Sequence, residues 1–232
     1  MTHRQLLACS LAAALLYCLA PAASFAQRQA PPSRSLLVRL RSFLGLQPRL
    51  VSVGGTRSNT AQTVCLLAPG PTESGPTGAV VRVLDPQPRL VLGHPLNEIE
   101  LRRGEVVLWS QLASSKAPIR GPLAWPLPAM QAGDRLELAL RPQGAAGGDW
   151  AVVTLEAASA EAQQRYASAV SATASSPEQR LLRIDQAAKS GDAPLAQALL
   201  WAPLMTGGGS LEALQTELRS LCTTPPTSRS LR

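Results

Sequence analysis

Aromatic side chains are scarce in this sequence of 232 residues, where Phe, Tyr and Trp together make up 3%. A hydrophobic core must therefore be built from Leu, Val and Ala with a few Trp residues. Histidine is scarcer still, because His94 in the turn sequence LGHPL is the only one after residue 26. A Ser-His-Asp triad would have to use it, and no G-x-S-x-G motif is present. These absences argue against a serine hydrolase.

Other catalytic and cofactor motifs are also missing. The TGGGS stretch at 206–210 lacks the lysine of a phosphate-binding loop and a preceding strand. Glu98 and Glu100 share one face of a predicted strand, but the neighbouring Arg102 and Arg103 indicate a solvated charged face rather than a glycosidase pair. We therefore predict no metal, no cofactor and no enzymatic activity.

The N-terminus carries the clearest signal. It has a short basic start, an apolar run from Leu6 to Ala20, and a small-x-small ending at Ser24-Phe25-Ala26. This pattern predicts a secretory signal peptide over residues 1–26, cleaved after Ala26, and a periplasmic or extracellular protein. The run is short for a membrane span, although an uncleaved anchor is the alternative.

Two of the four cysteines, Cys65 and Cys222, follow the predicted signal peptide. A pair of thiols in an exported chain is most simply one disulfide, here between an early strand and the last helix. Two buried free thiols are the alternative.

Acidic residues are absent before Glu73, so the whole net charge of +7 lies in the N-terminal part of the chain. The rest carries 15 basic and 15 acidic residues, with no basic stripe interleaved with aromatics, and we predict no binding to nucleic acid. For residues 27–49 we predict a basic linker and a short amphipathic helix over 34–47. Such a helix can rest on an anionic membrane, or it can pack on the body of the protein with its arginines in solvent. The candidate membrane contacts are Arg39, Leu40, Arg41 and Phe43.

Residues 50–157 have the pattern of a β domain. RLELALR at 135–141 alternates leucine with charged residues, as a half-buried strand does. Frequent Pro and Gly turns between short strands favour an antiparallel Ig-like β-sandwich. The further predicted strands are 64–69, 79–84, 89–93, 97–103, 105–112 and 150–157.

The stretch GPLAWPLPAM at 121–130 interrupts these strands. Its prolines, which cannot donate to a sheet ladder, predict a crossing loop or an edge. Trp125 is interpreted as the anchor of this crossing, and an exposed Trp-Pro platform for a sugar or a proline-rich peptide is the alternative. Trp125 and Trp109 are the candidate contacts to a ligand or partner.

Residues 158–222 have helical patterns, and residues 223–232 form a predicted disordered tail. The sequence SPEQ places Ser176 as an N-cap, Pro177 at the first helical position and Gln179 in a capping box. Short helices of this kind are marginal alone, so they must pack on each other or on the β domain as a small bundle.

The order of motifs over 64–157 resembles a secreted cyanobacterial family of unknown function. The matching residues are Cys65, Trp109, Pro122, Trp125 and Gly133. The resemblance implies an Ig-like β domain, a helical C-terminal region and an envelope context, and it carries no catalytic residue across.

The sequence as a whole predicts an α+β protein, with an antiparallel Ig-like β-sandwich followed by a small C-terminal helical bundle. We expect an exported, non-enzymatic envelope protein whose partner is another envelope protein or a glycan. The alternatives are a membrane-peripheral protein docked through 34–47, and a carbohydrate-active or carbohydrate-binding protein.

Overall fold

The computed structural model of the chain describes residues 50–52, 63–70, 73–75, 78–114, 116–205 and 209–223. All of these belong to one unit, Pro31–Arg232. The predicted signal peptide, the segment 27–49 and residues 224–232 of the predicted tail lie outside the described residues. In the part of the chain that is described, no helix is both long and apolar enough to cross a membrane.

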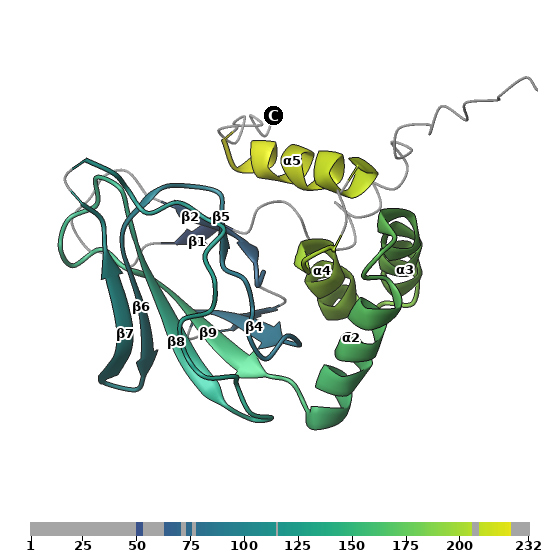
Figure 1. Cartoon of the computed structure of the whole chain (residues 1–232). Coiled ribbons are helices and arrows are strands. Elements are labelled where there is room, and N and C mark those ends of the chain that lie inside the picture. The colour runs from purple at the N-terminus through teal and green to yellow at the C-terminus, as the bar shows by residue number, and fades with distance from the viewer. Residues whose placement is uncertain are drawn as a thin grey trace, which may run out of the picture. The chain divides into compact units, whose positions relative to one another are not determined.

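The described strands form two sheets (Figure 1). The larger sheet has six strands in the order β3-β4-β9-β8-β6-β7, and the smaller has three in the order β1-β2-β5. The strands are β1 (Leu50–Ser52), β2 (Thr63–Ala68), β3 (Glu73–Gly75), β4 (Gly78–Val83), β5 (Val91–Leu92), β6 (Leu96–Arg103), β7 (Val106–Leu112), β8 (Arg135–Pro142) and β9 (Ala151–Ala157).

One pair of neighbouring strands runs parallel. In β4 and β9, Ala79 lies opposite Val153 and Val83 lies opposite Ala157, whereas the other neighbours pair antiparallel. The prediction of an antiparallel Ig-like sandwich is therefore wrong, and the chain has a mixed α+β fold. An alternating pattern shows which side chains of a strand are buried, but it contains nothing about the direction of the neighbouring strand.

Strand β2 lies between two apolar clusters. Val64 and Leu66 belong to the cluster on the inner face of the six-stranded sheet. Cys65 and Leu67, which point the other way, belong to the cluster formed mainly by the helices. A strand buried on both faces has a continuous apolar run rather than an alternating one, which accounts for the sequence VCLLA.

The proline-rich stretch crosses beside β5. Leu90 and Leu123 exchange two main-chain hydrogen bonds of 3.0 and 2.9 Å. Gly121 comes so close to this strand that an added Cβ would overlap the main-chain nitrogen of Leu92. The stretch is thus a crossing segment held against the smaller sheet, as its prolines predicted.

Four described helices follow the strands. Ser176 caps α3 as predicted, because its hydroxyl accepts a 3.2 Å hydrogen bond from the main-chain N–H of Gln179, and Pro177 is the first helical residue. The last helix begins at Gly209. The helices are α2 (Ala160–Ala172), α3 (Pro177–Lys189), α4 (Ala193–Trp201) and α5 (Gly209–Thr223).

An arginine with no exposed surface lies at the centre of the helices. Arg180 of α3 donates to Thr173 Oγ1 at 2.6 Å and to the carbonyl oxygen of Val170 at 3.3 Å, both at the C-terminus of α2. It also donates to the carbonyl oxygens of Leu199 and Ala202 at the end of α4, at 3.4 and 3.2 Å. One cation therefore meets the negative ends of two helix dipoles. Burial away from water lowers the pKa of this guanidinium.

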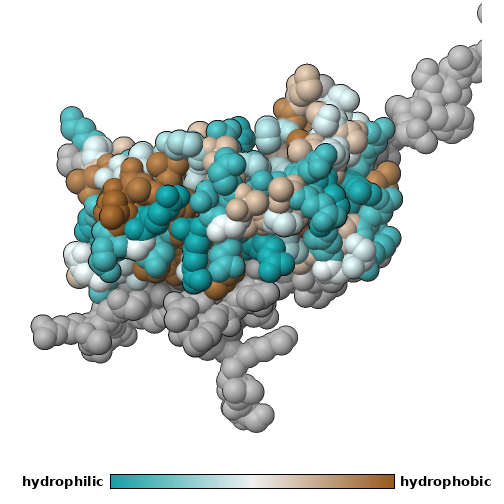
Figure 2. Space-filling view, turned by 90° about the horizontal axis from the view of Figure 1, so that it is seen from below, coloured by the Kyte–Doolittle hydropathy of each residue, from teal (hydrophilic) through white to brown (hydrophobic). Residues whose placement is uncertain are grey.

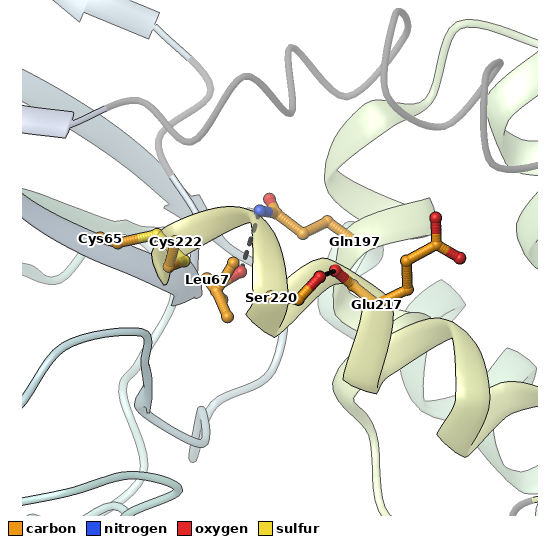
Figure 3. The surroundings of a disulfide bond; sticks show 6 residues. All are labelled: Cys65, Leu67, Gln197, Glu217, Ser220 and Cys222. Atoms are coloured by element: carbon orange, nitrogen blue, oxygen red, sulfur yellow. Dashed lines mark hydrogen bonds between the residues drawn. A yellow bond between two sulfur atoms is a disulfide. The ribbon is translucent and has the colours of Figure 1, made fainter. Parts of the chain in front are cut away.

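The predicted disulfide between Cys65 and Cys222 is present and joins β2 to the end of α5 (Figure 3). The two Cα atoms are 5.8 Å apart and both cysteines are buried. Close by, the side-chain amide of Gln197 on α4 donates to the carbonyl oxygen of Leu67 at 3.3 Å. A Cβ added to Gly93 would overlap Cys222, so β5 also lies close to this junction.

Candidate functional site

Among the described residues, the strand β7 has an exposed apolar surface that neither the helices nor the core covers. It follows β6 through a two-residue turn, in which Gly104 has a positive φ of 57° and Arg103 lies opposite Val106. It is the last strand in the order of the six-stranded sheet. No described strand pairs with its outer side, so within the part of the chain that the structure describes β7 is an open sheet edge.

The side chains of β7 are unusual for such an edge. Its sequence VVLWSQL contains no charged residue, and six of its seven residues are exposed. Soluble proteins commonly protect sheet edges with charges, prolines or very short strands. A large apolar patch is seen on the side of the molecule where the β6–β7 hairpin lies (Figure 2). The exposed apolar side chains of β7 are Val106 (61%), Val107 (48%), Leu108 (40%) and Leu112 (66%).

Along this edge, the main chain of β7 presents hydrogen-bonding groups that no described strand uses. The N–H of Ala113 donates to the carbonyl oxygen of Asn97 at 2.7 Å, which marks these two residues as a hydrogen-bonded pair. Because such pairs alternate along an antiparallel ladder, the main chain of Gln111 faces β6 as well. The N–H and carbonyl groups of Ser110 and Leu112 therefore point away from β6, toward the open side.

A β-bulge at the start of β7 shapes its apolar surface. The register shifts between Leu101, which lies opposite Trp109, and Arg102, which lies opposite Val107. The extra residue, Leu108, is left without a partner on β6. Trp109 itself is half-buried and packs on the core of the β part. The candidate contact Trp109 thus mainly anchors the strand, and its neighbours form the exposed surface.

Beside β7, the outer face of the sheet is covered by paired charges. Glu98 forms an ion pair with Arg141 of β8, and Glu100 forms one with Arg102. Both arginines lie over the ring of Trp150, at 5.1 and 5.6 Å from its centroid. The two carboxylates are thus engaged by guanidinium groups, as expected for a charged sheet face and unlike a pair prepared for glycoside hydrolysis.

Trp125 has an internal role in the structure. Its indole N–H donates to the carbonyl oxygen of Pro128 at 3.0 Å, and its ring packs against the apolar cluster of the β part. The polar group with which a tryptophan would orient a sugar is therefore already used within the proline-rich stretch. The binding of a sugar or a proline-rich peptide at Trp125 stays a prediction.

A small cavity of about 40 Å³ lies between the sheets and the helices, with Tyr166 and Trp201 in its wall. The hydroxyl of Tyr166 donates to Asp85 Oδ2 at 3.0 Å. Burial, together with the nearby negative charge of Asp85, raises the pKa of Tyr166 well above its ordinary value. A cavity of this size holds water but no larger ligand, since ligand pockets are several hundred Å³.

A wider hollow of about 1040 Å³ lies along α2, α3 and the start of α4. Polar residues of its walls pair within their own helices, as Arg165 does with Glu161 at 2.9 Å and Arg183 with Gln186 at 3.3 Å. The exposed large apolar residue in this hollow is Leu182, at 63%. Without a continuous apolar floor, this hollow has fewer features of a binding site than β7.

No group of three or more His, Cys, Asp or Glu side chains among the described residues is arranged to hold a metal ion. The candidate membrane contacts Arg39, Leu40, Arg41 and Phe43 lie outside the described residues, so docking through 34–47 stays a prediction. Sequence reasoning placed a strand at 105–112 but did not identify it as an open edge. The signal was present in the seven consecutive uncharged residues of VVLWSQL.

Comparison with family models, with curated proteins and with solved structures finds no match for this chain. The resemblance to a secreted cyanobacterial family therefore stays a prediction.

Proposed function

We propose that the protein is an exported, non-enzymatic interaction protein of the cell envelope, which binds its partner by adding an extended strand to β7. The observation that carries this proposal is the open edge itself. Ser110 and Leu112 turn their main-chain groups outward on a strand of seven uncharged residues. Strand addition uses such groups for affinity and the alternating side chains for specificity.

Export is supported by the disulfide and by the predicted signal peptide. Disulfides form and persist in oxidising compartments and are rare in the cytosol. Cys65 and Cys222 are buried and bonded across the junction of sheet and helices, so their role is structural rather than catalytic. We therefore propose that the protein works in an oxidising compartment outside the cytosol, where the Cys65–Cys222 disulfide persists.

The absence of enzymatic activity is supported by the state of the polar groups. The acidic pair on β6 is bound by arginines, and the hydroxyl of Tyr166 is bound to Asp85 in a cavity of about 40 Å³. An active site needs a nucleophile or an acid–base group that can reach a substrate in a pocket. Among the described residues, the exposed apolar side chains of β7 are the ones that we propose contact another molecule.

The proposal is tested by a photo-crosslinking amino acid placed at Leu112 in the native cells. Leu182 on α3 is a matched control, because it is the same residue type with a similar exposure, 63% against 66%. We expect a crosslinked adduct at Leu112 and none at Leu182. In a second variant, Ser110→Pro is combined with the crosslinking amino acid at position 112. This change removes an outward-facing N–H but leaves the hydrogen bonds to β6, so the adduct should disappear. Adducts that form equally at both positions, or that survive Ser110→Pro, would show that β7 is not the binding edge.

A further inference from the structure

We infer that the strand added to β7 is β7 of a second copy of this chain, running antiparallel across a two-fold axis. This inference rests on the proposed function, since it names the partner of the same edge. An isologous contact needs a surface that is complementary to itself. The edge of β7 meets this condition in its hydrogen bonds, its side chains and its charges.

The outward-facing residues determine the register. If Ser110 of each copy lies opposite Leu112 of the other, both residues form hydrogen-bonded pairs, and all four of their outward main-chain groups in each copy are used. The axis then passes at Gln111, which lies opposite Gln111 of the other copy as a non-hydrogen-bonded pair. On the outer face, the two Leu112 side chains become diagonal neighbours, within reach of each other.

The charges at the two ends of the strand complement each other in this register. Glu105 precedes β7 and Lys116 lies in the turn that follows it, and both are exposed. Antiparallel pairing about Gln111 brings the two-residue turn of one copy beside the turn after β7 of the other. Each Glu105 then lies near Lys116 of the other copy, twice in the dimer, and the uncharged stretch between them faces itself. A parallel arrangement would instead place like charges side by side.

The size of the patch predicts a weak dimer. The exposed apolar surface of β7 comes from four side chains in each copy, Val106, Val107, Leu108 and Leu112, far fewer than the about 20–30 residues per partner of a typical stable interface. The paired strands add main-chain hydrogen bonds to this surface. We therefore expect a reversible dimer that forms at micromolar concentrations and above, and dissociates on dilution.

Sedimentation velocity of the purified, oxidised protein over a concentration series tests this inference. The wild type should shift from monomer to dimer with rising concentration. Ser110→Pro and Gln111→Lys should stay monomeric, because the first removes an outward N–H and the second places two like charges opposite each other on the axis. Gln111→Thr, at the same exposed position, should still dimerise. Circular dichroism checks that each variant is folded. If Ser110→Pro does not fold, the result for Gln111→Lys alone decides whether β7 forms the dimer interface.

Cysteine crosslinking tests the register. Gln111→Cys places two cysteines at a Cα separation of about 4.5 Å across the axis, within the range of a disulfide. Ser110→Cys places them about 8 Å apart, beyond that range. We expect a covalent dimer with Gln111→Cys and none with Ser110→Cys. Crosslinking of Ser110→Cys in preference to Gln111→Cys would overturn this register.

The two proposals fail in different ways. In the first case, the wild type is monomeric at every concentration, and the mass of the Leu112 adduct in cells identifies another protein. This result overturns the inference of a β7–β7 dimer but is consistent with strand addition to β7. A monomer that gives no adduct at Leu112 overturns both. A dimer that is unchanged by Ser110→Pro and Gln111→Lys shows that the copies meet elsewhere.

Discussion

The buried Arg180 allows the most quantitative prediction, because its four hydrogen bonds are all to neutral acceptors at two helix ends. Replacing Arg180 by Met keeps much of the volume but leaves the carbonyl oxygens of Val170, Leu199 and Ala202 without this donor. We expect the free energy of unfolding to fall and α2 and α4 to lose their common attachment to α3.

The magnitude follows from the two shortest bonds, at 2.6 Å to Thr173 Oγ1 and 3.2 Å to the carbonyl oxygen of Ala202. A hydrogen bond to a charged group contributes about 1.5–3 kcal/mol, so the two together contribute about 3–6 kcal/mol. Removing the cation also removes the cost of burying it, which offsets part of this loss. A net loss of about 3 kcal/mol is expected for Arg180→Met. Arg180→Lys should lose a similar amount, since one ammonium cannot reach both helix ends.

Urea unfolding followed by circular dichroism, with the disulfide intact, measures this loss. Arg183→Met is the control, because Arg183 lies one turn away on the same helix and is exposed, and its change should stay within about 0.5 kcal/mol. An Arg180→Met variant as stable as the wild type would refute the reasoning, since burial of the cation would then cost as much as its bonds contribute.

The other two stability predictions concern the junction between the sheets and the helices. Cys65 and Cys222 close a loop with a sequence separation of 157 residues, so replacing both by Ala should lower the free energy of unfolding by up to about 5 kcal/mol in urea titrations; an unchanged stability would contradict this. Tyr166 has a raised pKa, so the folded state keeps a proton that the unfolded state loses above its ordinary pKa of about 10, and stability should fall as pH rises through that value. Tyr166→Phe should remove this loss of stability at high pH. If the phenolate absorbance of Tyr166 in the folded protein titrates near pH 10, the raised pKa is contradicted.

The local elements were predictable where the pattern of one segment is enough. The alternation in 135–141 gave the strand β8 (Arg135–Pro142), and the SPEQ cap gave the start of α3 at Pro177. The disulfide followed from cysteine number and the predicted export. The strand and the helix start depend on residues that are close in the sequence. The disulfide was predictable because only two cysteines follow the predicted signal peptide, so only one pairing is possible.

The arrangement of the strands was not predictable in the same way. β4 and β9 pair in parallel although about 70 residues separate them, and no local pattern carries that information. The edge position of β7 also depends on which strands fill the rest of the sheet. Arg180 was missed for a related reason, because an arginine in a helix is expected at the surface unless the ends of other helices surround it.

Amide hydrogen exchange of β7, followed residue by residue by NMR, tests the central claim most directly. In the dilute protein, the amides of Trp109 and Gln111 should be protected by β6, while those of Ser110 and Leu112 exchange rapidly. At concentrations where the protein associates, or with its partner bound, Ser110 and Leu112 should become protected as well. Rapid exchange of these two amides in the associated state, with new protection elsewhere, would contradict strand addition at β7.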